Sequence, residues 1–441
     1  MNEAPELPAV DSSTVYVMPG DSLGEALDVA AAAAPDARNV MICGDRPGAG
    51  RSGAETYVGA AGRWWPVDST RVTRYNVRGK FATDGGRVLT VQRAEPWFDV
   101  GVLPGDAAEA MRYVRGVCAD FGVRPGGTPG STGRRMLAES WRRLDHQYEP
   151  CPDDIATILR DTSGQGRFEV FPHAANGGDR LAYVDARFQY GACAATELPC
   201  GVPEMIDGEC ADQYAPTWCE VEFVPCGDVG VLPFRMGKAW EWPTGPGPYR
   251  SWCSGAELHL ARKVGYTATV LRSIVWPGRG LPLASWAGVI SRGRSRIDEL
   301  PVADGVRSAA RSALRSILIQ TIGGLHGRND SANVTGVPFA SANETDLTKR
   351  PADRSGVSQS RPEWTVAIWS LARTRLAKIM LGQRAPLVAC TLDGFYVDGV
   401  PSVNGDNGKP GTFRTVWERG DWSPITSLAD VYALDAVEVE A

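Results

Sequence analysis

The sequence has few of the residues and patterns that mark specialised protein classes. It contains only four histidines, at positions 146, 173, 259 and 326, and they form no H-E-x-x-H metal-binding pattern. Its longest run of small apolar residues, 29–34, is far shorter than the roughly 20 residues that a membrane span needs. The first residues, MNEAPELPAVD, show no basic segment followed by an apolar one, so no signal peptide is expected. These absences predict a cytoplasmic protein with no membrane partner.

The composition is that of a folded globular chain. The 50 glycines and 31 prolines among 441 residues stay below the roughly 25–30% that indicates low complexity. Hydrophobic residues make up 43% and charged residues 22%, both ordinary values. Length alone suggests about three domains. Disordered, collagen-like and coiled-coil classes are therefore excluded, and many turns are expected.

The formal net charge is −6 at pH 7. Because proteins bind the phosphate backbone with lysine and arginine, an acidic chain is a poor candidate for coating DNA with its whole surface. A basic groove in an acidic exterior remains compatible with this charge.

Ten cysteines are present, and five of them fall between 193 and 226. No two of these five have the C-x₂₋₄-C spacing of a structural zinc site, which favours buried thiols over a zinc cluster. The glycine-rich segment 44–53 departs from the phosphate-loop pattern, because its glycines are one residue too far apart and Arg51 replaces the lysine. It is expected to be a surface turn.

Hydrophobic periodicity and turn residues predict an α/β (α+β) chain. Segment 125–133, PGGTPGSTG, is expected to be a turn-rich connector, and 217–236 a β-hairpin. Residues 386–399 should form two strands with a tight break at Asp393-Gly394. Strand 180–186 should be followed by a helical stretch at 188–198. Further helices are expected at 23–34, 107–121, 304–322 and 363–380.

Two aspartates stand at the ends of apolar strands. Asp185 ends the strand that contains Leu181 and Val184, and Asp393 lies at the break after 387–392. A carboxylate there is costly unless it meets a cation or a hydrogen-bond donor. If the two strands are neighbours in an antiparallel sheet, both carboxylates can bind a pair of Mg²⁺ ions, the arrangement used in nucleotidyl transfer. The alternative is that both aspartates only cap turns.

The predicted helix at 304–322 has one apolar stripe and a row of arginines beside it. Arg307, Arg311 and Arg315 follow each other at intervals of four residues. A row of guanidinium groups suits a triphosphate, whereas a solvated helix face is the simpler alternative.

Three segments resemble the sequence motifs of family B DNA polymerases, in particular the compact protein-primed phage type. YVDARFQYGACAATELPCGVPE (183–204) resembles motif A, D-x-x-S-L-Y-P followed by L-P-x-G-x-P. ARSALRSILIQTIGGLHGR (310–328) resembles motif B, K-x-x-x-N-S-x-Y-G, and VACTLDGFYV (388–397) resembles motif C, Y-x-D-T-D-S. Four further segments resemble the family in the same order: TPGS (128–131), 217–234 with SWCSGAEL (251–258), RPEWTVAIWSLARTRL (361–376) and GKPGTFRTVWE (408–418).

The resemblance implies a polymerase right hand with palm and fingers and a shortened exonuclease-like N-terminal domain. Asp185 and Asp393 would be the catalytic ligands of two Mg²⁺ or Mn²⁺ ions, and Tyr190 would pack under the incoming sugar. Gln320 takes the place of the motif B asparagine, so it and the three arginines would contact the nucleotide. DNA template and primer, dNTPs and a priming or accessory protein are the implied partners. The implied parts are a tail (1–13), the N-terminal domain (14–124), the palm with motif A (125–300), the fingers helix (301–330), a polar loop (331–361) and the palm with motif C (362–441).

The departures from the family pattern point to a reduced protein. Thr391 stands where motif C has its first aspartate, Gly191 replaces the motif A proline, and Ser316 falls at the position of the triphosphate-binding lysine. The N-terminal region lacks D-x-E, which predicts no proofreading, and the thumb with its K-x-Y motif is expected to be missing or vestigial. A catalytically inactive polymerase-derived protein that binds DNA or initiates replication is the alternative.

Overall fold

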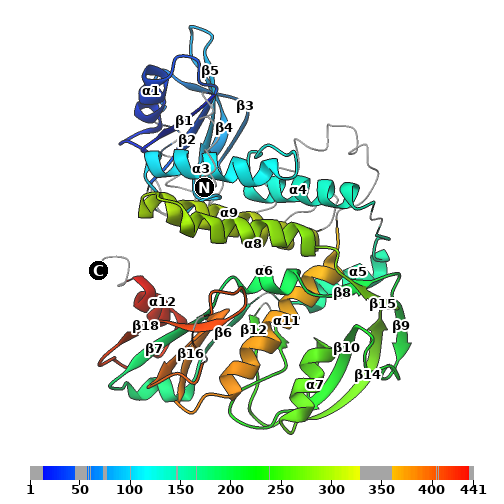
Figure 1. Cartoon of the computed structure of the whole chain (residues 1–441). Helices are drawn as coiled ribbons and strands as arrows, with labels where there is room; N and C mark the ends of the chain where they lie inside the picture. Colours follow the sequence, from blue (N-terminus) through cyan, green and yellow to red (C-terminus); the bar gives the residue numbers. More distant parts are fainter. Residues whose placement is uncertain are drawn as a thin grey trace, which may run out of the picture. The chain divides into compact units, whose positions relative to one another are not determined.

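A computed structural model describes residues 13–44, 57, 59, 61–72, 77–99, 101–145, 148–164, 166–237, 239–327, 360–403, 405 and 407–436. Residues 1–12 of the expected tail, most of the glycine-rich segment 44–53 and residues 331–359 of the expected polar loop lie outside these residues. The chain forms two compact units (Figure 1). The first consists of Met1–Asp145 and Gly288–Gln359, and the second of His146–Ala287 and Ser360–Ala441.

The first unit begins with a five-stranded sheet in the order β1-β2-β5-β4-β3. Strands β1 (Thr14–Val17), β2 (Asn39–Ile42) and β5 (Val88–Arg93) are parallel, and β4 (Val77–Ala82) and β3 (Trp65–Val72) continue it as an antiparallel meander. Helix α1 (Leu23–Ala33) confirms the helix expected at 23–34. The Ser22 hydroxyl caps α1 by accepting from the backbone N–H of Glu25 at 3.2 Å.

Described helices of the first unit also include α3 (Pro104–Ala119), α4 (Pro129–Arg143), most of α8 (Ala284–Glu299) and α9 (Asp304–His326). Helix α9 packs against both α3 and α4. Gly133 of α4 leaves room for Thr321 of α9, because a Cβ at Gly133 would collide with the Thr321 hydroxyl. The expected apolar stripe of α9 is buried, which confirms the periodicity argument; it consists of Val306, Ala310, Ala313, Leu314 and Ile317.

The prediction of a turn-rich connector at 125–133 is wrong for its second half. Helix α4 already begins at Pro129, with Thr128 and Ser131 forming a capping box. The Thr128 hydroxyl accepts from the backbone N–H of Ser131 at 3.2 Å, and the Ser131 hydroxyl accepts from that of Thr128 at 3.3 Å. The glycines and proline therefore start a helix that packs with α9 in the first unit. The six-part domain division itself stays a prediction.

The second unit contains two larger sheets. The first, called here the palm sheet, has the order β18-β7-β17-β16-β6, and all of its neighbouring strands are antiparallel. Its strands are β6 (Arg167–Val170), β7 (Leu181–Ala186), β16 (Leu387–Leu392), β17 (Gly394–Asp398) and β18 (Phe413–Arg419). The second sheet has the order β13-β10-β14-β9, with strands β9 (Glu204–Asp207), β10 (Thr217–Val224), β13 (Tyr249–Ser254) and β14 (Thr267–Val275).

Helices and short strands surround the two sheets of the second unit. Helix α11 (Pro362–Leu381) confirms the helix expected at 363–380. It contacts α6 (Gln189–Ala194), α7 (Gly255–Lys263) and α5 (Asp153–Thr162). Two-stranded ladders join β8 (Leu198–Cys200) to β15 (Gly278–Gly280) and β11 (Phe234–Met236) to β12 (Ala239–Glu241). A 3₁₀ helix (Pro172–Asn176) and α12 (Leu428–Ala436) complete the unit.

The prediction of a β-hairpin at 217–236 is wrong. Strand β10 pairs with β13 and β14, while residues after Pro225 form only the short strand β11, paired with β12. The backbone N–H of Val231 donates to the hydroxyl of Tyr266 at 3.0 Å. A side chain thus satisfies this N–H, and Gly230 lies against the backbone of Trp242. Residues 230–232 are therefore buried as a loop rather than as a strand.

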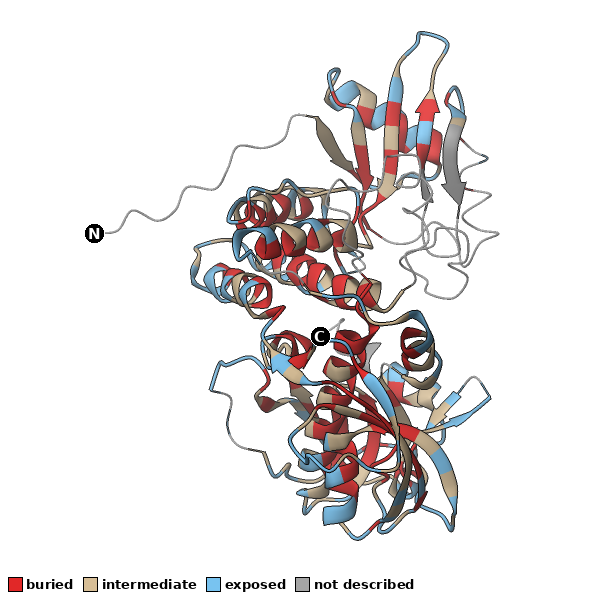
Figure 2. Cartoon of the chain, turned by 90° about the vertical axis from the view of Figure 1, so that its right-hand side faces the viewer, coloured by how far each residue is buried: buried red, intermediate tan, exposed pale blue. Residues whose placement is uncertain are grey.

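Each unit has its own buried core, seen as red positions on the strands and helices in Figure 2. One face of the palm sheet, with Val184, Cys390 and Phe395, packs with residues of α11, such as Leu376 and Met380. Other palm-sheet residues, including Leu181 and Tyr396, pack with Trp422, Ile425 and Val431. Among the described residues, no helix is long and apolar enough to cross a membrane.

Glu363, at the start of α11, is a buried acid whose protonation should make the free energy of unfolding depend on pH. Burial raises the pKa of Glu363 to about 7, despite the guanidinium of Arg361 at 3.9 Å. Arg361 instead donates to the carbonyl oxygens of Ser360 at 3.0 Å and Tyr148 at 2.5 Å. The folded state therefore holds the Glu363 proton more tightly than the unfolded state does, so stability falls as pH rises from about 4.5 to about 7.

Glu363→Gln is expected to remove this pH dependence. A pKa raised from 4.5 to about 7 corresponds to a destabilisation of about 3 kcal/mol above pH 7. The variant should therefore match the parent at pH 4.5 and exceed its unfolding free energy at pH 8, measured by denaturant titration. Glu197→Gln, at an exposed site of the same unit, is the control and should keep the parent's slope. Equal slopes for parent and Glu363→Gln would contradict a buried neutral acid.

Candidate active site at the end of the palm sheet

The palm sheet brings Asp185 and Asp393 to the same end of two neighbouring strands. Gly394 of β17 lies directly opposite Asp185 of β7, and Asp393 immediately precedes Gly394. One residue along a strand is about 3.3 Å and one strand spacing about 4.8 Å, so the two Cα atoms are about 6 Å apart. The tight break expected at Asp393-Gly394 is observed. The strand next to β7 is β17, which follows the break, whereas β16, the strand before Asp393, is one strand further away.

Unusual backbone conformations flank both aspartates. Within the described part of the chain, three non-glycine residues have positive φ angles, namely Asp145, Phe188 and Leu392. Leu392, with φ of 53°, directly precedes Asp393, and Phe188, with φ of 49°, is three residues after Asp185. Such a conformation costs about 1–3 kcal/mol and tends to occur at functional sites.

Glycines make room for the two unusual side chains. A Cβ at Gly166 would collide with Leu392, and a Cβ at Gly191 would collide with the ring of Phe188. Gly191 is the residue that replaces the proline of the motif A pattern. Its lack of a side chain is therefore required by the Phe188 ring, which gives this departure a structural reason.

A cation lies in the same row of the sheet as Asp185. Arg414 of β18 is directly opposite Asp185, on the side away from Gly394, and Thr391 of β16 is directly opposite Gly394. Directly opposite residues share a face of the sheet, so Arg414, Asp185 and Thr391 project to one side. Sequence reasoning missed Arg414, because only the strand register shows that it is next to Asp185.

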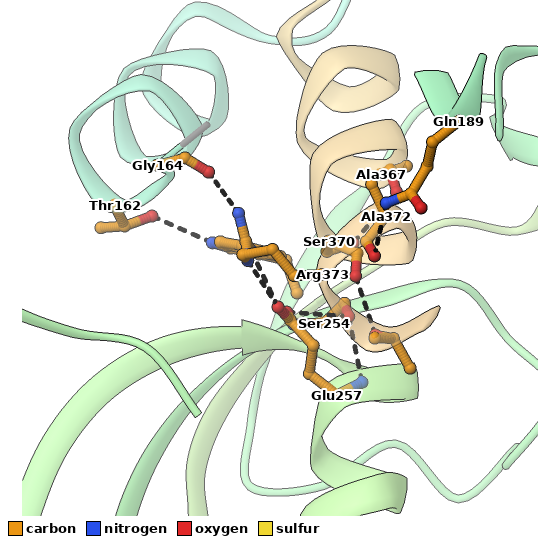
Figure 3. Close-up of polar contacts among 11 residues, drawn as sticks. Thr162, Gly164, Gln189, Ser254, Glu257, Ala367, Ser370, Ala372 and Arg373 are labelled. Atoms are coloured by element: carbon orange, nitrogen blue, oxygen red, sulfur yellow. Dashed lines mark hydrogen bonds and ion pairs between the residues drawn. The ribbon is translucent and has the colours of Figure 1, made fainter. Parts of the chain in front are cut away.

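The segments behind the aspartates are tied to α11. The Nη2 atom of Arg375 donates to the carbonyl oxygen of Gly411 at 2.7 Å. Gly411 has a φ of 81°, and a Cβ there would lie 2.5 Å from the Arg375 guanidinium. Gln189 of α6 donates to the carbonyl oxygen of Ala372 at 2.9 Å (Figure 3). Burial raises the pKa of Cys193 to about 11, although nearby Arg375 lowers it. Helix α6 and the loop before β18 are thus fixed around the site.

Tyr190 lies in α6, with 7% of its surface exposed. It follows Asp185 by five residues, and Gln189 beside it anchors the helix to α11. Its contact with a nucleotide sugar stays a prediction.

The remaining candidates belong to the first unit, on α9. Arg307 donates to the carbonyl oxygens of Leu300 at 3.2 Å and Val302 at 3.3 Å and pairs with Asp304. Arg311 is 3.4 Å from Asp298, and Arg315 is exposed.

The side-chain amide of Gln320 makes its hydrogen bonds within the first unit. Its amide nitrogen donates to the carbonyl oxygen of Pro96 at 2.8 Å, and its amide oxygen accepts from the N–H of Gly130 at 3.3 Å. These bonds show Arg307 and Gln320 in structural roles, and nucleotide contact by the four α9 residues stays a prediction.

The two aspartates fit a Mg²⁺ site in which the protein supplies two ligands, and water and substrate phosphates supply the rest. In the described residues, no group of three or more His, Cys, Asp and Glu side chains could hold a metal ion. Mg²⁺, however, commonly binds through one or two carboxylates, with water and substrate phosphates as the other ligands. Asp185 and Asp393 supply such a pair of hard oxygen donors. All ten cysteines are free thiols. Of the five between 193 and 226, Cys193 and Cys219 are buried, Cys200 and Cys210 are partly buried and Cys226 is exposed, so the expectation of buried thiols holds for two of the five.

Comparison with solved structures shows what this fold is similar to. The chain resembles phi29 DNA polymerase complexed with single-stranded DNA, with 14% identity and a TM-score of 0.53 over 87% of this chain and 76% of that one. It also resembles phi29 DNA polymerase complexed with primer-template DNA and incoming nucleotide substrates, with 12% identity and a TM-score of 0.56 over 87% and 77%. No family model and no curated protein matches the sequence. The chain therefore has a mixed α/β fold similar to that of phi29 DNA polymerase, which confirms the predicted fold class.

Proposed function

We propose that this protein is a reduced family B DNA polymerase-like nucleotidyltransferase, which adds nucleotides to a DNA 3′-OH or a protein hydroxyl without proofreading. The observation that carries the proposal is the pair Asp185 and Asp393 at one end of the palm sheet, each close to a residue with positive φ. The phi29-like fold supports it, since that polymerase is seen with primer-template DNA and nucleotides.

The proposed roles follow from the chemistry of the side chains. Asp185 and Asp393 bind two Mg²⁺ or Mn²⁺ ions through carboxylate oxygens. When bound, the ions stabilise the attacking and leaving oxygens of an in-line displacement. Tyr190 restricts the sugar. For the triphosphate, the resemblance to motif B names Arg307, Arg311, Arg315 and Gln320 of α9 as the candidates. The partners are DNA template and primer, dNTPs, and a priming or accessory protein.

A second candidate is a catalytically inactive DNA-binding or replication-initiation protein derived from a polymerase. One observation favours it: the row that contains Asp185 also contains the cation Arg414 and the neutral Thr391. A cation beside the carboxylates lowers the negative charge that attracts a divalent metal ion.

Labelled-nucleotide incorporation distinguishes the two candidates. The full chain is incubated with dNTPs or NTPs, Mg²⁺ or Mn²⁺, and primed or unprimed templates, beside an Asp185→Ala/Asp393→Ala variant. Metal-dependent incorporation by the parent that disappears in the variant supports the polymerase and identifies its sugar and primer. If parent and variant are equally inert while both bind DNA, the binding protein is correct.

DNA affinity should fall with salt under either candidate. Phosphate contacts by a few arginines release counterions, so the association constant should drop at least about tenfold between 50 and 200 mM salt. Fluorescence anisotropy of a labelled primer-template measures this directly. An affinity unchanged over this range would argue against both candidates.

A further inference from the structure

Tyr183 is an aromatic residue of β7 near both aspartates in the sheet register. It precedes Asp185 by two residues on β7, so both side chains project from the same face. A Cβ at Gly394 would overlap the Tyr183 hydroxyl and would lie 2.6 Å from its Cε2 atom. The phenol edge therefore rests on Gly394, the residue that follows Asp393 and is directly opposite Asp185.

The ring of Tyr183 is held in place from two other strands. It stacks on Tyr396 of β17 with 4.7 Å between ring centroids, and Trp417 of β18 is 5.8 Å away. Tyr396 is completely buried and is also 5.8 Å from Trp417. The close stack on the buried Tyr396 ring directs the Tyr183 hydroxyl toward the end of the sheet where the aspartates lie.

We propose that Tyr183 is a positioning residue whose hydroxyl orients the Asp185 and Asp393 carboxylates for binding a divalent metal ion. The inference rests on the proposed function, because it assumes that these carboxylates hold metal. An ionised carboxylate only accepts hydrogen bonds, whereas a phenol hydroxyl can donate one to the oxygen that faces away from the ion. Loss of such an outer partner commonly weakens metal affinity by about 10–100-fold. Gly394 is needed because any side chain there would push the hydroxyl away.

Mn²⁺ titration of the full chain, with free Mn²⁺ measured by electron paramagnetic resonance, tests this role without requiring activity. Tyr183→Phe keeps the ring and is expected to weaken Mn²⁺ binding about tenfold or more. Gly394→Ala should weaken it in the same direction by displacing the hydroxyl. Trp417→Phe changes the ring packing but keeps the hydroxyl, and its Mn²⁺ affinity should stay within about twofold of the parent.

The outcomes separate this inference from the proposed function. Asp185→Asn/Asp393→Asn identifies the Mn²⁺ bound at the aspartates, and a parent with no such binding overturns the proposed function and this inference together. If the double variant loses Mn²⁺ but Tyr183→Phe binds it like the parent, only the positioning role is overturned. Equal losses in Tyr183→Phe and Trp417→Phe would also overturn it, because ring packing alone would then explain the effect.

Discussion

Asp393→Asn should lower nucleotide incorporation by about a thousandfold or more while changing the unfolding free energy by no more than about 1 kcal/mol. The amide keeps the size of the side chain in the turn between β16 and β17 but carries no charge for a metal ion. Bound metal contributes several kcal/mol of transition-state stabilisation, and about 4 kcal/mol corresponds to a thousandfold. Asp185→Asn should have a similar effect, because the two residues serve the same ions.

Asp398→Asn is the matched control for this experiment. Asp398 is the last residue of β17, the strand that begins at Gly394. Its carboxylate is 2.8 Å from Nε2 of His173. This substitution should lower stability without abolishing incorporation per folded molecule. Steady-state incorporation and denaturant unfolding, measured for all three variants, provide the comparison. Parent-like incorporation by Asp393→Asn or Asp185→Asn would contradict the proposed site.

The local features of this fold could be predicted because each depends on a short stretch of sequence. The apolar stripe of α9 follows from helical periodicity, and the break at Asp393-Gly394 follows from a turn dipeptide between two apolar runs. The position of Asp185 at a strand end follows from the apolar run before it. In the same way, the aspartates were identifiable as candidates before their strands were known to be neighbours.

Features that depend on strand pairing could not be predicted in this way. The run TWCEVEFV is a strand as expected, but its alternating pattern does not state that β13 and β14 are its partners. Arg414 became part of the site only through its register with Asp185. The positive φ of Leu392 also has no sequence signal, because leucine is unfavourable in that conformation.

Arg373→Met is expected to destabilise the second unit by about 3–5 kcal/mol. Arg373 of α11 and Glu257 of α7 are almost completely buried and form an ion pair in which Nε and Nη2 are each 2.9 Å from Oε1 (Figure 3). Arg373 also donates to the carbonyl oxygen of Gly164. Removing it leaves the Glu257 carboxylate charged and buried, which costs far more than the loss of a surface ion pair.

The second carboxylate oxygen of Glu257 accepts hydrogen bonds that a double variant has to preserve. Oε2 accepts from the backbone N–H of Ser254 at 2.9 Å and from its hydroxyl at 3.0 Å, so Glu257 also caps α7. Glu257→Gln/Arg373→Met keeps an acceptor for this cap and removes the buried charge. It should therefore cost only about 1–2 kcal/mol, less than Arg373→Met alone.

An exposed ion pair of the same unit supplies the control for burial. Arg262 pairs with Glu209 through two bonds of 2.6 and 3.0 Å, with both side chains more than a third exposed. Arg262→Met should cost about 1 kcal/mol or less, because solvent screens the charge that remains. Denaturant unfolding of the four proteins gives the comparison. If Arg373→Met and the double variant cost the same, the penalty comes from lost packing and the uncompensated charge of Glu257 is not its cause.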